Sequence, residues 1–179
     1  GDRLLRRGAF REAQRAYQAA WPHSKPLGRR QQVWLLLSIA HASLRAGDFG
    51  EALEACSAAQ QHFARDTGVV AGNPLFHLFA GVAADALGET RIAEDNLARA
   101  LICGGPALFT GEAPAHLERL RALLRPPAEL GTWDGYEGCS RDQLESVVDF
   151  VDGARGPLAE LLTTRLGRPP PYAGPPRPR

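Results

Sequence analysis

The sequence predicts an all-α protein made of stacked antiparallel helix pairs, followed by a helical C-terminal extension. Three observations favour this fold. One pattern of glycine, alanine and larger apolar residues occurs three times, apolar residues precede the copies at helical spacing, and proline and glycine separate them. With 179 residues and 44% hydrophobic content, the chain is long enough to form one compact domain with a core.

Each copy of the pattern predicts a turn and the helix that follows it. A glycine is followed after five residues by an alanine, after four more by a larger apolar residue, and after three more by a second alanine. Glycine tolerates the left-handed backbone between two antiparallel helices. The two alanines lie on one helix face, where a neighbouring helix can approach closely. The three copies are Gly8, Ala13, Tyr17 and Ala20; Gly47, Ala52, Cys56 and Ala59; and Gly88, Ala93, Leu97 and Ala100.

The stretches before the glycines predict the first helix of each pair. Residues 33–44 and 75–87 carry apolar side chains at helical spacing. In the second stretch, Gly81 occupies a position that calls for a small residue. Residues 1–7 predict a truncated first helix, and because the chain contains no methionine we expect a short N-terminal piece to be missing. The inward-facing positions of the first stretch are Leu36, Ile39, Ala40 and Ser43.

Together these residues resemble the tetratricopeptide repeat (TPR), which repeats a helix pair of about 34 residues. The resemblance covers residues 1–104 and implies three repeats, the first of them truncated, in a right-handed superhelix with a concave protein-binding groove. The repeat glycines here are 39 and 41 residues apart. The additional residues fall at 22–28 and 64–73, where turn formers predict longer loops and a looser stack.

Residues 105–167 predict the C-terminal extension. Leucines at helical spacing indicate a helix over 113–124, and two prolines end it. A long connection over 126–139 follows, and loops of this length are often functional.

A further helical segment is predicted beyond that connection. The residues Ser140–Gln143 form a capping-box pattern, which is typical of a helix N-terminus. Two apolar stripes follow, and we expect them to cover the open end of the stack. Residues 168–179 contain six prolines and are expected to be disordered. The stripes are Leu144, Val147, Val148 and Val151, and Leu158, Leu161, Leu162 and Leu166.

No motif for catalysis or metal binding stands out, so we expect a protein that is not an enzyme and needs no cofactor or metal. The sequence has no glycine-rich phosphate loop, HExxH or GxSxG motif, and its five histidines lack ligand spacing. The three cysteines, Cys56, Cys103 and Cys139, are not spaced as a disulfide framework or a zinc site. The enzyme alternative uses Cys139 at a helix N-terminus with His116 as base; we favour a small loop residue.

The TPR resemblance implies a largely apolar groove lined by the first helices of the second and third repeats. The alternative for Trp34 is core packing. In the long connection, Trp133 and Tyr136 are aromatic types that anchor interfaces, and the alternative is that both fold back onto the end of the helix stack. The implied groove residues are Trp34, Leu37, His41 and Arg45, and Leu75, Leu78, Val82 and Asp85.

These features predict a module that binds a partner protein or peptide. Residues 73–81 and 93–100 resemble the third repeat of type III secretion translocator chaperones, which implies an apolar cargo in the groove. An immunity protein that masks a toxin and a scaffold within a larger assembly are the alternatives. The net charge of +1 argues against nucleic acid, and no apolar run is long enough to span a membrane. We expect a bacterial, cytoplasmic protein, for which a homo-oligomer is one option.

Overall fold

The computed structural model describes residues 1–64, 74–110, 113–128 and 130–138, and all regular structure in these ranges is helical. The predicted all-α fold is therefore confirmed for this part of the chain. The helices are α1 (Asp2–Arg6), α2 (Phe10–Ala20), α3 (Arg29–Ala46), α4 (Phe49–Ala64), α5 (Pro74–Ala86), α6 (Thr90–Gly104) and α7 (Pro114–Leu123), with short 3-10 helices η1 (Trp21–His23) and η2 (Pro106–Phe109).

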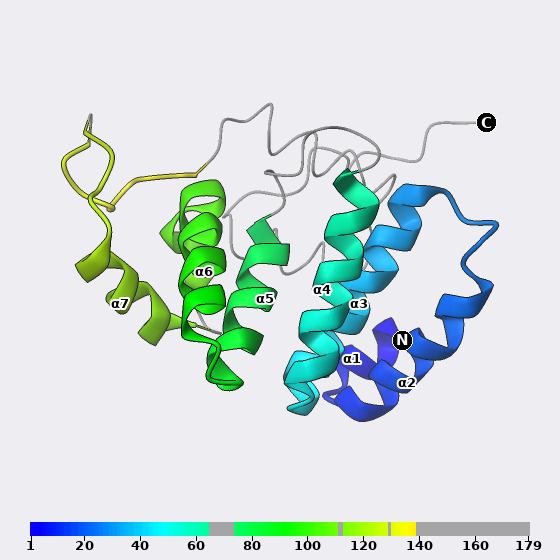
Figure 1. The fold of residues 1–179 in the computed structure, drawn as a ribbon. Coiled ribbons are helices and arrows are strands. Elements are labelled where there is room, and N and C mark those ends of the chain that lie inside the picture. Colours follow the sequence, from blue (N-terminus) through cyan, green and yellow to red (C-terminus); the bar gives the residue numbers. More distant parts are fainter. Residues whose placement is uncertain (65–73, 111–112, 129, 139–179) are drawn as a thin grey trace.

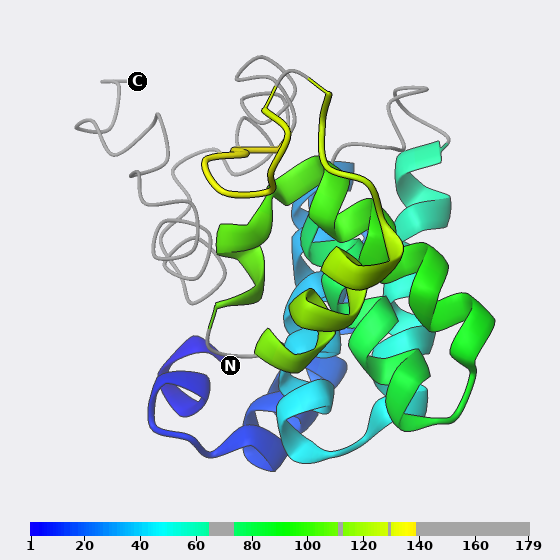
Figure 2. The same cartoon turned by 90° about the vertical axis from the view of Figure 1, so that its left-hand side faces the viewer.

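The helices pack in chain order as antiparallel neighbours (Figure 1). Helix α1 packs on α2, α3 on α4, and α5 on α6, and α2 and α4 also contact the first helix of the next pair. Helix α7 and the described residues 124–138 lie at the end of the molecule opposite to α1 and α2 (Figure 1), and this end faces the viewer in Figure 2. Consecutive packing of this kind places the same face of successive helices on the same side of the molecule.

The three repeat glycines adopt the left-handed backbone that the sequence predicts. Their φ angles are 75° at Gly8, 80° at Gly47 and 78° at Gly88. At each site, the N–H of the next residue donates to a carbonyl five residues earlier, at distances of 3.0, 2.9 and 2.9 Å. This bond belongs to the Schellman motif, which satisfies carbonyls at a helix C-terminus. The same hydrogen bond therefore closes α1, α3 and α5.

All of the repeat alanines except one are buried, as the pattern predicts. Ala13, Ala52 and Ala93, which come first in each copy, are completely buried. Of the second alanines, Ala59 and Ala100 are buried, whereas Ala20 is exposed. The prediction was wrong for Ala20 because α2 ends at this residue and the chain turns into η1.

In two of the helix pairs, a glycine of the first helix or its N-cap faces a large side chain of the second helix. A Cβ atom at Gly81 would lie 2.6 Å from Leu97 Cγ, and one at Gly1 would lie 2.0 Å from the ring of Tyr17. Both pairs are separated by 16 residues, and Gly1 and Gly81 occupy the same repeat position. A large side chain on the second helix thus requires glycine on the first.

Several predictions fall outside the described ranges. These include Cys139, the helices predicted over 140–166 and the proline-rich tail over 168–179. Within the described ranges, no helix combines the length and apolar character needed to cross a bilayer.

Enlarging a repeat alanine is expected to destabilise the protein. Ala52→Leu and Ala93→Leu each add a branched side chain where a neighbouring helix leaves no room, so we expect each to lower the free energy of unfolding by about 1–3 kcal/mol. Thermal unfolding followed by circular dichroism measures the effect. Ala20→Leu is the control, because Ala20 is exposed and should tolerate leucine. A melting temperature unchanged in Ala93→Leu would contradict the assignment of this contact.

Two helical glycines are expected to respond to alanine with opposite signs. Gly81→Ala places a Cβ 2.6 Å from Leu97 Cγ and 3.0 Å from its backbone nitrogen, so overpacking of about 1–3 kcal/mol should exceed the gain in helix propensity. Gly50 lies in α4 with no atom within 4 Å of an added Cβ. Gly50→Ala should therefore stabilise by roughly 0.5–1 kcal/mol. Urea unfolding of both variants measures the difference, and a stabilising Gly81→Ala would refute the close contact.

Candidate partner-binding surface

Half of the implied groove residues are buried between helices. Leu37 and Leu75 have no exposed surface and Leu78 is 1% exposed, so these three offer no contact area to a partner in this structure. His41 is also buried, and its ring stacks on Phe79 of α5 at 5.1 Å with an interplanar angle of 3°. These side chains pack α3 against α5 and stabilise the stack through apolar burial.

Four implied groove residues retain accessible surface, and one of them is the half-buried Asp85. Trp34 and Val82 are half-buried, and Arg45 is exposed at the C-terminal end of α3. The Arg45 guanidinium carbon lies 4.6 Å from the centre of the Phe10 ring, a cation–π distance. The Trp34 Nε1–H is buried and finds no hydrogen-bond acceptor among the described residues. Trp34 is thus the aromatic side chain of the implied groove that a partner can contact.

Asp85 forms an ion-pair cluster with α7. Both terminal nitrogens of Arg119 donate to Asp85 Oδ1, at 3.0 and 2.9 Å, and His116 Nε2 lies 3.2 Å from Oδ2. Burial opposes ionisation of this carboxyl group, but the hydrogen bonds and charges of Arg119 and His116 outweigh it and lower the pKa of Asp85. The cluster fastens α7 to the C-terminal turn of α5.

His116 and Arg119 were not predicted from the sequence as partners of Asp85. Both residues lie on the helix predicted over 113–124, three positions apart and therefore on one face. This spacing indicates that the two side chains can contact the same polar group. The identity of the opposing residue depends on how α7 packs, which no local pattern specifies.

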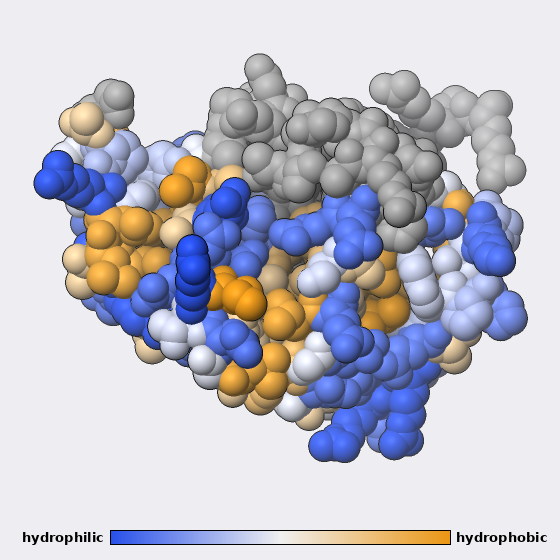
Figure 3. Space-filling view, viewed as in Figure 1, coloured by the Kyte–Doolittle hydropathy of each residue, from blue (hydrophilic) through white to orange (hydrophobic). Residues whose placement is uncertain are grey.

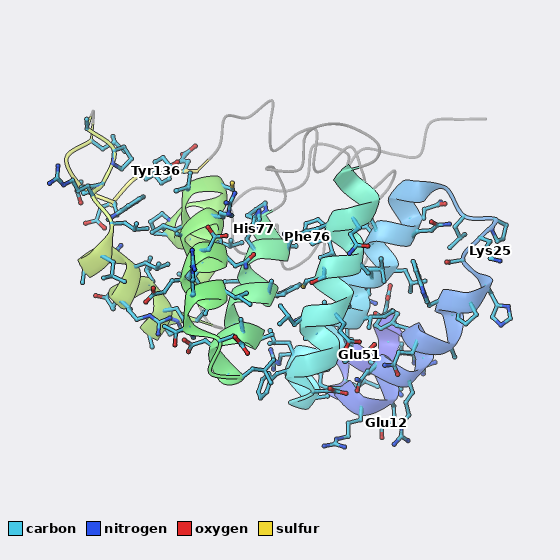
Figure 4. All side chains as sticks on the ribbon, viewed as in Figure 1. Glu12, Lys25, Glu51, Phe76, His77 and Tyr136 are labelled. Atoms are coloured by element: carbon cyan, nitrogen blue, oxygen red, sulfur yellow. The ribbon has the colours of Figure 1, made fainter. Side chains whose placement is uncertain are left out.

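The two aromatic residues of the long connection fold back onto the helices. Trp133 is 8% exposed, and its Nε1–H donates to the carbonyl of Leu124 at 3.3 Å. Tyr136 meets Trp133 edge to face at 5.5 Å, and its hydroxyl donates to the carbonyl of Ile102 at 2.7 Å. Figure 4 shows Tyr136 beside the end of α6. Trp133 therefore belongs to the core, and Tyr136 keeps a partly exposed ring.

Close backbone contacts fix the end of this connection against α6. A Cβ atom at Gly138 would lie 2.5 Å from the carbonyl oxygen of Cys103, and one at Gly105 would lie 2.6 Å from that of Tyr136. Both glycines also have positive φ angles. Only glycine fits such positions without displacing backbone atoms, so these two residues allow the connection to cover the end of α6.

A buried histidine joins α5 to α6. His77 is 4% exposed, and its Nδ1 lies 3.1 Å from Asn96 Oδ1. The Asn96 amide nitrogen donates to the carbonyl of Ile92, so the Asn96 oxygen faces the ring and His77 Nδ1 carries a proton. Burial lowers the pKa of His77, and the hydrogen bond that the ring donates to Asn96 opposes this effect. In Figure 4, His77 lies on the α6 side of α5 and Phe76 on the α4 side.

The described residues contain no arrangement that suggests catalysis. Burial raises the pKa of the Cys56 thiol to about 12, so this group is a poor nucleophile near neutral pH. His116, the base in the enzyme alternative, is occupied by Asp85. Within the same ranges, no group of three His, Cys, Asp or Glu side chains is placed to hold a metal ion.

Exposed apolar side chains concentrate at one end of the described molecule. Figure 3 shows apolar surface over α5, α6 and α7, and mainly polar surface over α1 and α2. Of six large apolar residues that are exposed, five fall between residues 87 and 130. They are Leu87, Ile92, Ile102, Leu123 and Leu130, and the sixth is Leu27. Apolar surface of this kind often marks contact with another molecule.

Comparison with known proteins found no match to a protein-family model, to a curated protein or to a solved structure.

Protonation of His77 should weaken the fold in mild acid. Because burial lowers the folded-state pKa below the ordinary 6.5, the unfolded chain binds a proton first as the pH falls. Stability is therefore independent of this group above pH 6.5 and decreases below it. Each kcal/mol lost should lower the melting temperature by roughly 2–4 °C. Scans between pH 7.5 and about 5 compare wild type with His77→Gln, which should lose this pH dependence, and with His23→Gln, an exposed control that should keep it.

Proposed function

We propose that this protein is a non-catalytic module that binds a partner protein or peptide on the side of the stack formed by α3 and α5. The observation that carries the proposal is the repeated helix pair, closed three times by the same glycine turn and packed in chain order. Stacks of this type present extended surfaces suited to binding proteins. The TPR resemblance implies the same function.

The accessible groove residues support a partner contact centred on Trp34. A half-buried tryptophan presents a large apolar area, and tryptophan is among the most frequent residues at the energetic centre of interfaces. Arg45 and Val82 provide one charged and one apolar contact on neighbouring positions of the implied groove. Holding an apolar secretion cargo and masking a toxin are two roles that would use such a surface.

Replacing Trp34 tests this proposal. We expect Trp34→Ala to weaken partner binding by about tenfold or more, because truncation of a central interface tryptophan typically costs about 2 kcal/mol or more. The full chain would be immobilised and exposed to an extract of its source organism. Bound proteins would be identified by mass spectrometry, and the affinity of the purified partner would be measured by calorimetry.

Trp21→Ala is the matched control for this experiment. Trp21 is also half-buried, but it lies in η1 outside the implied groove, so its variant should retain the partner. Equal loss of binding in both variants would contradict a contact at Trp34. Collapse of the far-ultraviolet circular dichroism signal in Trp34→Ala would show instead that this residue stabilises the core.

A further inference from the structure

The formal charge of the chain is divided unevenly along its length. Residues 1–30 contain eight Lys and Arg against two Asp and Glu, a net charge of +6. Residues 31–138 contain seven basic and thirteen acidic residues, a net charge of −6. The overall value of +1 therefore hides a basic N-terminal segment, which includes the first helix pair, attached to an acidic remainder.

Four arginines of the first helix pair are exposed at intervals of four residues. Arg3 lies in α1, Arg7 is its C-cap, and Arg11 and Arg15 lie one turn apart on α2. No ion pair or hydrogen bond involves the side chains of these four residues within the described ranges. Like charges one turn apart on a helix repel each other and destabilise it slightly.

Three arginines elsewhere in the described chain form ion pairs with carboxylates. Arg99 pairs with Asp95 at 2.9 Å, Arg119 with Asp85 at 2.9 Å, and Arg121 with Asp134 at 3.1 Å. Arg91 and Arg125 also have no carboxylate partner among the described residues, but neither belongs to a run of such arginines. The first helix pair is thus the place where unbalanced positive charge accumulates.

The acids of the first helix pair do little to balance this charge. Asp2 accepts a hydrogen bond from the hydroxyl group of Tyr17, which occupies one of its oxygens. Glu12 is exposed on α2 and is the other acidic residue of the segment (Figure 4). One carboxylate in the middle of four guanidinium groups leaves a clear positive excess.

From these observations we infer that the exposed arginines of the first helix pair, centred on Arg11 and Arg15 one turn apart on α2, bind a short acidic segment of a partner protein. The inference rests on the proposed function, because it names the chemistry of the bound protein. Guanidinium groups pair with carboxylates through two parallel hydrogen bonds. Glutamates one turn apart on a partner helix would match the spacing of Arg11 and Arg15 on α2.

The surroundings of this surface favour a short acidic segment over nucleic acid or an anionic membrane. Gln14 of α2 donates to Asp48 at 2.8 Å, which places the acidic start of α4 directly beside α2. Glu51 and Glu54 follow Asp48 on that helix. A nucleic acid or a bilayer extends its negative charge well beyond α1 and α2 and would meet these carboxylates. A segment no longer than α2 avoids them.

A labelled synthetic peptide with glutamate at every fourth position tests the inference. Its binding to the full chain would be followed by fluorescence anisotropy at low and physiological ionic strength. We expect binding that weakens with salt, and that weakens about tenfold in Arg11→Gln/Arg15→Gln, because two charge-assisted contacts are lost. Glutamine preserves helix propensity, so the fold should remain intact.

Arg91→Gln/Arg125→Gln is the control, because it removes the same net charge from exposed arginines outside this surface. Retained peptide binding in this control supports the inference. Equal weakening in both double variants would overturn it, because net charge alone would then explain binding.

Tighter binding of single-stranded oligothymidine, or of phosphatidylserine-containing vesicles, would also overturn the inference, as would no binding of the peptide. Partner capture that depends on Trp34 but not on Arg11 and Arg15 would leave the proposed function standing while this inference fails.

Discussion

The close approach of the two helices in each pair is the constraint on which the rest of the structure depends. It requires a left-handed glycine at the turn and small residues where the helices touch. Gly81 against Leu97 and Gly1 against Tyr17 satisfy it by pairing the smallest residue with a large one. Because interiors are close-packed, this size matching fixes how far apart each pair of helices lies and which face it offers to the next pair.

The two ends of the described stack are finished in different ways. At one end, Asp85 binds His116 and Arg119, and the connection after α7 covers the end of α6 through Trp133 and two close glycine contacts. If another helix pair followed, these residues would lie on the surface of the stack. Here they form contacts within the molecule instead. At the other end, α1 and α2 form a short pair with a largely polar, arginine-rich exterior. The apolar and the basic surfaces of the described molecule are consequently separated.

This separation places two chemically distinct regions on the described part of the molecule. Apolar contacts supply most of the free energy of protein binding, whereas charged groups mainly set orientation and association rate. A basic surface at one end and accessible apolar side chains near the other suit a partner that is itself unevenly charged. The arginines of α6 and α7 that form ion pairs are neutralised by carboxylates, so they add little positive charge to the surface of that half of the molecule.

The sequence by itself determined the helix pairs, because a glycine turn and the alanines that follow it act locally. The left-handed angles at Gly8, Gly47 and Gly88 and the burial of Ala13, Ala52 and Ala93 were predictable for this reason. Only the tertiary structure decided which predicted groove residues stay accessible. Helical spacing shows which side chains share a face, but not which neighbour covers that face. Leu37, Leu75 and Leu78 are therefore buried, Asp85 binds α7, and Ala20 is exposed where its helix ends.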